Sequence, residues 1–323
     1  MSATEIARAV TLLKSGNVVA IPTETVYGLG ADASNPEAVR KIFALKGRPA
    51  DHPLIVHLHD AGQLTRWTAD VTKQVIKLSA KFWPGPLTVI LKRAKGVPLE
   101  VTGGLETVGL RIPSHPVARE LLCEFDGGIA APSANRFGRV SPTTAQHVRE
   151  EFGAELPMIL DGGPCSVGVE STIVDLSSEA PAILRPGGIT QEQLESALGT
   201  SVPFRATGNV RAPGTLEAHY APRAQVLLCN PEEVETRLAA LQERKLAVAL
   251  LSSQKPVGLP ANVEFIPMPV DAEGQARELY AALRRADETQ CDAILVTLPP
   301  AEGLGVAVID RLTRAAATIR SEE

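Results

Sequence analysis

Along the N-terminal part of the chain, the spacing of apolar residues switches between that of a helix and that of a strand. Residues 4–15 present one apolar helical face and stop at Gly16, which predicts a first helix. The apolar run 17–21 then predicts a buried strand. Asn35 as cap and Pro36 at the first helical position mark the start of a second helix.

Short apolar runs continue through the first two hundred residues and are separated by helical patterns. We predict strands at 54–58, 87–91, 108–112, 129–131, 171–175 and 182–185, and helices at 70–82, 116–125 and 143–152. Strands and helices mixed in this way predict an α/β (α+β) domain over residues 1–200, with a twisted mixed sheet and helices packed on it.

The pattern lapses at 201–224, where two Gly and three Pro stand among polar residues, as in an interdomain connector. Strands then alternate with helices over residues 225–323. We expect strands at 225–229, 245–251, 263–267 and 292–298, and helices at 231–243, 272–288 and 304–318. This predicts a smaller Rossmann-like domain, although no GxGxxG follows its first strand to mark a dinucleotide site.

Composition is that of a globular protein, and its charge argues against one class of function. A chain of 323 residues with 44% apolar and 21% charged residues supports two domains, each with a core of its own. The net charge of −5 disfavours a protein that mainly grips a nucleic-acid backbone. Only 201–224 is net positive, with Arg205, Arg211 and Arg223 against Glu217, so a local anion contact is one interpretation there.

Cysteine usage and the apolar runs bear on metal sites and compartment. The four cysteines include no CxxC pair, which disfavours a zinc site, and buried thiols are the simplest interpretation. Cys165 lies in a Gly-rich loop, where a reactive thiol is the alternative. The start MSATEIARAV lacks the pattern of an export signal, and runs such as 245–251 are too short for a membrane helix, so we expect a cytoplasmic protein.

Candidate chemistry lies in irregular loops, because neither a Walker A motif nor the protein-kinase motifs occur. Five loops combine Gly or Pro with polar groups suited to anions: 22–30, 46–53, 111–116, 132–142 and 161–171. Lys46 and Arg48 stand two apart past a helix end, where both could reach phosphate oxygens. The alternative is a favourable interaction with the helix C-terminus.

Four further polar residues lie at or just past the ends of predicted strands, and each allows two interpretations. Ser133 and Asn135 could bind a ligand or cap a turn. Arg185 could bind an anion or pair with a surface acid. Ser171 could contact a ligand or have a structural role at the edge of the core. None of these residues decides the function alone.

Taken in order, the loops carry a set of motifs that resembles one family. Over about residues 5–200 these are PTETVYGLG, KGRP followed by PLIVH, GLRIP, APSAN, SPT, ESTIVD and LRPGG, and together they resemble a YrdC-type domain. HYAP, from His219 to Pro222, and the α/β tail resemble the longer, two-domain threonylcarbamoyl-AMP synthases. An ordered set of this kind is far more specific than any single motif.

The resemblance implies a nucleotidyltransferase reaction that belongs to tRNA processing. L-threonine, bicarbonate or CO2, and ATP would give threonylcarbamoyl-AMP and pyrophosphate, and separate proteins would transfer the threonylcarbamoyl group to a tRNA adenosine. Mg2+ would be bound mainly through the ATP phosphates, with no dedicated protein cage. Glu24 and Asp161 are either ligands to that ion or structural acids.

The same resemblance implies the site residues. Threonine contacts would fall on Thr25, His57, Arg111, Ala131 through its backbone, and Ser171. ATP contacts would fall on Arg48, His52, Thr107, Ser133, Asn135, Ser141, Arg185 and Tyr220. Lys46 and Arg48 would neutralise the triphosphate during catalysis, and Arg111 would hold the threonine carboxylate by a two-pronged contact. His52 stands where family members often have Asn.

Two rival interpretations are weaker. Hydrogenase-maturation carbamoyl transfer uses a similar domain beside Cys-rich zinc fingers, and four scattered cysteines exclude it. A double-stranded-RNA-binding module without ATP chemistry, or a weak RNA affinity beside the enzyme activity, is the other, and the acidic balance disfavours it as the main role. Because HYAP falls in the connector, we also expect the second domain to gate the reaction.

Overall fold

Capping residues set the first two helices where the sequence predicts them. In the computed structural model, which describes residues 2–205, 213–214 and 219–317, helix α1 (Ala3–Lys14) begins at a capping box between Ser2 and Glu5. The side chain of Asn35 accepts hydrogen bonds at the start of α2 (Pro36–Lys46). That helix ends at Gly47, whose φ of 61° is left-handed and favours glycine.

The first of two compact units comprises residues 1–137 and 141–215 and is built on a mixed eight-stranded sheet. Only the β3–β5 and β4–β7 pairs are parallel among its strand pairs in the described residues. In sheet order the strands are β1 (Val19–Ile21), β2 (Gly28–Asp32), β6 (Ile129–Ala130), β3 (Ile55–His57), β5 (Thr107–Arg111), β4 (Leu87–Lys92), β7 (Thr172–Asp175) and β8 (Ala182–Arg185). The predicted fold class is confirmed, and the predicted strands are present with ends shifted by up to two residues.

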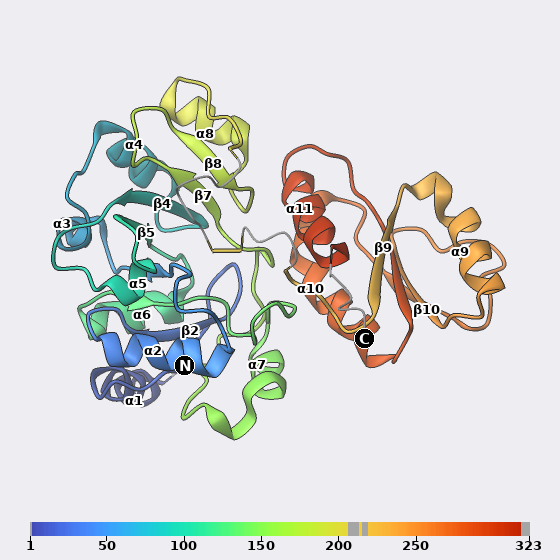
Figure 1. Cartoon of the computed structure of the whole chain (residues 1–323), viewed down its shortest axis with the longest axis horizontal. Helices are drawn as coiled ribbons and strands as arrows, with labels where there is room; N and C mark the ends of the chain where they lie inside the picture. Colours follow the sequence, from blue (N-terminus) through green and yellow to red (C-terminus); the bar gives the residue numbers. More distant parts are fainter. Residues whose placement is uncertain (1, 206–212, 215–218, 318–323) are drawn as a thin grey trace. The chain divides into compact units, whose positions relative to one another are not determined.

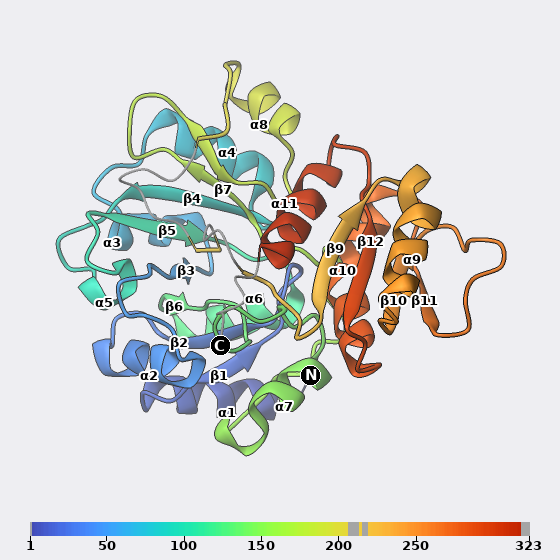
Figure 2. The same ribbon diagram turned by 45° about the vertical axis from the view of Figure 1, so that its right-hand side comes forward.

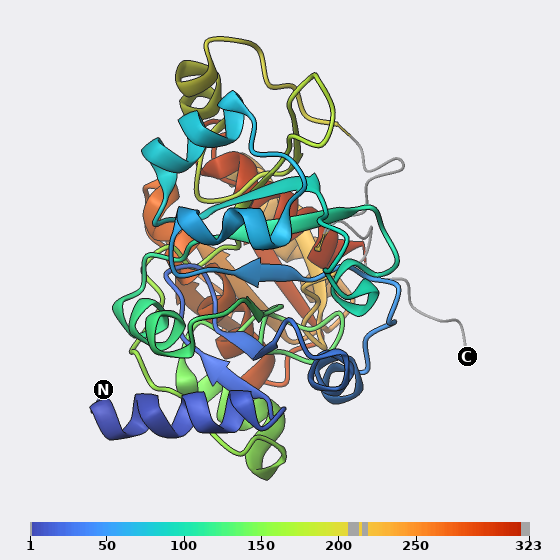
Figure 3. The same cartoon turned by 90° about the vertical axis from the view of Figure 1, so that its left-hand side faces the viewer.

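Alternation along the strands buries both faces of this sheet. Val19 and Ile21 point to a core shared with α1 and α6 (Pro116–Phe125), whereas Val18 and Ala20 point to a larger core on the other face. Helix α1 packs along α6 and against β1 and β2 (Figure 3). The larger core is covered by residues of α2, α3 (Leu64–Trp67), α4 (Lys73–Phe82), α5 (Leu99–Thr102), α7 (Ala145–Phe152) and α8 (Gln191–Leu198).

Strand β2 differs from the sequence prediction, which treats 22–30 as a loop throughout. The structure begins a strand at Gly28, because two glycines let β2 approach its neighbours closely. A Cβ at Gly30 would lie 3.0 Å from the Ile129 side chain, and one at Gly28 would lie 3.1 Å from the Ala131 Cβ. The glycines that suggest a loop are therefore demanded by the sheet.

The second unit comprises residues 138–140 and 216–323 and is a small parallel α/β fold, as predicted. Its sheet order is β11 (Val263–Pro267), β10 (Val248–Ser252), β12 (Ala293–Thr297) and β9 (Gln225–Cys229). Helix α9 (Val234–Glu243) covers one face, and α10 (Ala272–Glu288) and α11 (Gly305–Ala316) cover the other (Figures 1 and 2). Across the described residues, the search for a helix long and apolar enough to cross a membrane found none.

The HYAP segment packs into this second unit, whereas the sequence prediction places it in a connector outside both folds. Tyr220 is 1% exposed, has a φ of 63°, and its ring lies against Tyr280 and beneath the Arg311 guanidinium. The Ala221 N–H donates to the Gly138 carbonyl, at 2.8 Å. The structure therefore divides the chain near residue 215, and Arg211 and Glu217 of the predicted connector lie outside the described residues.

Candidate active site

The loop that follows β1 is closed on itself by threonine hydroxyls. The Thr23 hydroxyl donates to the Val26 carbonyl at 2.6 Å and accepts from the Thr25 and Val26 N–H groups, both at 3.2 Å. Thr23, Glu24 and Thr25 are all buried. The local sequence thus builds a tight turn that holds Glu24 and Thr25 in place.

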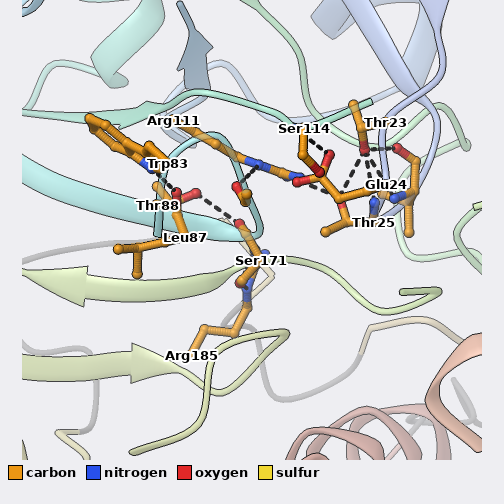
Figure 4. Close-up of polar contacts among 12 residues, drawn as sticks. Thr23, Glu24, Thr25, Trp83, Leu87, Thr88, Arg111, Ser114, Ser171 and Arg185 are labelled. Carbon is orange, nitrogen blue, oxygen red and sulfur yellow. Dashed lines mark hydrogen bonds and ion pairs between the residues drawn. The ribbon is translucent and has the colours of Figure 1, made fainter. Parts of the chain in front are cut away.

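Arg111, at the end of β5, reaches into this turn (Figure 4). Its Nε donates to the Gly85 carbonyl at 3.3 Å, Nη1 to the Thr25 hydroxyl at 2.9 Å, and Nη2 to a Glu24 oxygen at 2.7 Å. A guanidinium has five N–H donors, so these bonds leave one on each terminal nitrogen. A carboxylate is the ligand that such a pair of donors binds best.

Glu24 is a site residue whose role the sequence did not reveal. It is 4% exposed, and its second oxygen accepts from the Ser114 N–H at 3.1 Å. Burial by itself would raise the pKa of Glu24, but the Arg111 guanidinium and the backbone hydrogen bonds to the carboxylate together hold the pKa below its usual range. Because 87 residues separate Glu24 from Arg111, no local pattern could have revealed the pair.

His57 lies beside Arg111, since the two residues are paired in register between β3 and β5. Its side chain is buried, and burial, aided by the Arg111 charge, lowers the pKa of His57 to about 3. Its Nδ1 has no hydrogen-bond partner of normal geometry among the described residues. The neutral imidazole thus lies beside Arg111 with its Nδ1 buried and unpaired, and the Ile55 and Ile129 backbone groups also interact with the ring.

Ala131 offers one backbone group rather than two. Its N–H already donates to the Ile55 carbonyl at 3.0 Å, which leaves the Ala131 carbonyl as the group for an incoming donor. The structure thus brings Thr25, His57 and Arg111 together, whereas Ala131 follows the inner strand β6 and is bonded to Ile55, two residues before His57 on β3.

Lys46 supports the loop that carries two of the predicted nucleotide residues. It is 3% exposed, and its ammonium donates to the Ser133 carbonyl at 2.5 Å and to the Asn135 carbonyl. Burial, with the nearby Arg48 charge, lowers the pKa of Lys46 well below its usual range. The structure thus gives Lys46 a part in shaping loop 133–135, and its contact with a triphosphate remains a prediction.

The other residues of the 46–53 loop lie next to the same region. Arg48 donates from Nη2 to the Pro53 carbonyl at 2.9 Å, and the His52 ring lies 5.5 Å from that of Phe137, two residues past Asn135. Thr107, by contrast, begins the strand that Arg111 ends, so roughly 13 Å of extended chain separates them.

Two buried clusters complete the set of predicted residues. The Ser141 hydroxyl donates to Glu170 at 2.7 Å, and both side chains are buried. Arg185 donates to the Ser171 carbonyl at 2.8 Å and to its hydroxyl at 3.1 Å, and that hydroxyl is 2.8 Å from the Thr88 hydroxyl (Figure 4). Arg185 therefore holds Ser171, which joins a predicted nucleotide residue to a predicted threonine residue.

Glu170 is an acid that the sequence analysis did not name as a candidate. Its negative charge acts on Lys46 and opposes the fall of that lysine's pKa, so the two lie within electrostatic reach. In the sequence it is only the first residue of ESTIVD, directly before the predicted strand 171–175. Asp161, by contrast, is half-exposed and pairs with Arg149 at 3.1 Å.

The remaining candidates have partners of their own. Arg205 pairs with Asp175 at 3.3 Å, and Arg223 pairs with Asp287 at 3.1 Å. Cys165 is buried, and burial raises its pKa to about 12, so the thiol stays protonated at neutral pH. Tyr220 belongs to the second unit, and its contact with ATP remains a prediction.

Comparison with known proteins adds relatives along the whole chain. Residues 11–187 match the Sua5/YciO/YrdC family model, described as "Telomere recombination", and residues 189–317 match "Threonylcarbamoyl-AMP synthase, C-terminal domain". A threonylcarbamoyl-AMP synthase of Bacillus subtilis is 41% identical and one of Pyrococcus abyssi 40%, with 97% and 94% of this chain and 93% and 91% of theirs covered. The crystal structure of P. abyssi Sua5 with L-threonine superposes with a TM-score of 0.93 at 39% identity, over 98% of this chain and 95% of that one.

The first unit is thus a YrdC-type domain with a buried, arginine-centred site. With its C-terminal α/β unit, the chain belongs to the threonylcarbamoyl-AMP synthase family. The resemblance seen in the ordered motifs is confirmed.

Proposed function

We propose that this protein condenses L-threonine, bicarbonate or CO2, and ATP into threonylcarbamoyl-AMP and pyrophosphate. The observation that carries the proposal is the Arg111 guanidinium, held on three sides and left with one N–H on each terminal nitrogen. Beside it stands the neutral, buried imidazole of His57. An α-amino acid with a polar side chain suits such a site, and relatives at about 40% identity are named for this product.

In the first step, the amine of threonine must become a nucleophile. Arg111 would hold the substrate carboxylate, and the Ala131 carbonyl would accept from its amino group. A site that removes water from an ammonium lowers its pKa and favours the neutral amine. The neutral amine attacks the carbon of CO2, loses a proton and forms an N-carboxylate; starting from bicarbonate, one water is released.

In the second step, a carbamate oxygen attacks the α-phosphorus of ATP, the bond from that phosphorus to the bridging oxygen breaks, and pyrophosphate leaves. Such a displacement needs alignment and charge neutralisation more than covalent help from the protein. Arg48, Ser133, Ser141 and Arg185 would hold the nucleotide. Arg185 is well placed to couple the two substrates, since it already binds Ser171.

Mg2+ would enter with the ATP phosphates, whose charge it would offset. Among the described residues, a search for three or more His, Cys, Asp or Glu side chains grouped as metal ligands found none. Magnesium sites that use substrate phosphates need only one or two carboxylates. Glu170, buried beside Ser141, is a candidate for that part. The product would then pass to separate proteins that modify tRNA.

The test is pyrophosphate release from ATP with each substrate omitted in turn. We expect release only when threonine and bicarbonate are both present. Undiminished release without threonine would refute the proposal. RNA binding that weakens with salt, in a protein without ATP chemistry, would instead favour an RNA-binding role.

A further inference from the structure

Glu24 is wedged between two hydrogen-bond donors in the first unit (Figure 4). One carboxylate oxygen faces Arg111 Nη2 at 2.7 Å and the other faces the Ser114 N–H at 3.1 Å. An ionised carboxylate is acceptor-only, so it satisfies both donors at once. An amide of the same shape would have to place its NH2 group against one of them.

Glu24 also carries the only charge among the groups that hold Arg111 within the described residues. The other two contacts are the Gly85 carbonyl, at 3.3 Å, and the Thr25 hydroxyl. Charge-assisted hydrogen bonds are roughly twice as strong as neutral ones. The plane of the guanidinium, and with it the direction of its two remaining N–H groups, is therefore set mainly by Glu24.

We propose that Glu24 is a positioning residue that aims Arg111 at the carboxylate of the amino-acid substrate. The proposal rests on the proposed function, because it takes that substrate to be threonine held through Arg111. Glu24 also has a structural role, because the Val167 N–H donates to its carbonyl at 2.7 Å and ties the 22–27 turn to Val167. The positioning role is distinct from this structural role. A purely structural residue would affect the affinity for every ligand equally, whereas this positioning residue would affect only the affinity for a ligand that carries a carboxylate.

The experiment is a thermodynamic cycle that combines one substitution in the protein with one change in the ligand. Dissociation constants for L-threonine and for L-threonine amide, which lacks the carboxylate charge, are measured by calorimetry on wild type and on Glu24→Gln. We expect wild type to prefer threonine strongly and the substitution to shrink that preference about tenfold or more, because a hydrogen bond to a charged group is being misaligned. Both ligands are measured on one preparation, so their ratio does not depend on the fraction folded.

A matched control separates this effect from general loss of stability. Asp175→Asn alters another buried carboxylate of the same unit, which pairs with Arg205 and accepts a hydrogen bond from the Ser177 N–H rather than contacting Arg111. We expect it to lower stability and to leave the preference for threonine over its amide unchanged.

An unchanged or increased preference in Glu24→Gln would overturn the proposal. Should that variant fold too poorly, Glu24→Asp keeps the charge but withdraws the carboxylate by one methylene, and its preference ratio is read in the same way. Wild type that binds threonine but releases no pyrophosphate would instead count against the proposed function. The two failures are therefore distinguishable.

Discussion

Replacing His57 with glutamine should flatten the dependence of stability on pH in the first unit. The folded pKa of His57, about 3, lies far below the ordinary histidine value of about 6.5. Between these values the unfolded chain binds a proton that the folded chain does not, so stability falls as the pH falls below 6.5. The stability that the neutral His57 contributes is fully present above pH 6.5 and is lost progressively as the pH falls toward 3.

The size of the effect follows from the same shift. Between pH 7 and pH 5, protonation of His57 in the unfolded chain lowers the free energy of unfolding by roughly 2 kcal/mol. Glu24, whose pKa Arg111 helps to hold below its usual range, is present in both proteins, so its own titration does not distinguish them. Wild type should therefore lose roughly 2 kcal/mol more than His57→Gln between these two pH values.

The assay can be confined to the unit that holds His57. Both tryptophans, Trp67 and Trp83, belong to the first unit, so urea unfolding followed by tryptophan fluorescence reports on that unit alone. Unfolding free energies are compared at pH 7 and pH 5 for both proteins. Equal pH dependence in the two would show that the imidazole titrates normally and would refute the burial argument.

Three further outcomes follow from single contacts. Lys46→Met should leave the Ser133 and Asn135 carbonyls without their donor. It should therefore destabilise the first unit by roughly 2 kcal/mol or more and raise the KM for ATP more than that for threonine; equal changes in both KM values would contradict this. Peptide mapping after a thiol reagent should find exposed Cys123 modified before buried Cys165, and the reverse order would contradict it. Arg284→Met removes a donor to the Val140 carbonyl, at 2.5 Å, and should speed amide hydrogen exchange around residue 140; Arg285→Met, on an exposed position of the same helix, should not.

The fold could be predicted largely because local signals and tertiary structure agree. Asn35, Pro36 and Gly47 mark one helix from end to end, and the apolar runs mark strands buried on both faces. Strand β2 escaped prediction because Gly28 and Gly30 look like loop residues until the neighbouring strand is known. The order of strands in the sheet could not be deduced from any local pattern.

Candidate site residues could be chosen by type and motif, but their partners could not be predicted. Arg111 stands out in GLRIP, yet Glu24, its ionic partner, lies 87 residues away. Lys46 suggests a phosphate ligand in sequence, and its burial beneath loop 133–135 becomes visible only in the fold. Tyr220 reads as a connector residue because Tyr280 and Arg311, which bury it, come much later in the chain.

The most direct test of the account is the fate of labelled bicarbonate. With 14C-bicarbonate, L-threonine and ATP–Mg2+, the protein should form a labelled adenylate in equal amount to the pyrophosphate released. Arg111→Ala should abolish both together. Pyrophosphate released without incorporation of label into an adenylate, or labelled product formed without threonine, would contradict the account.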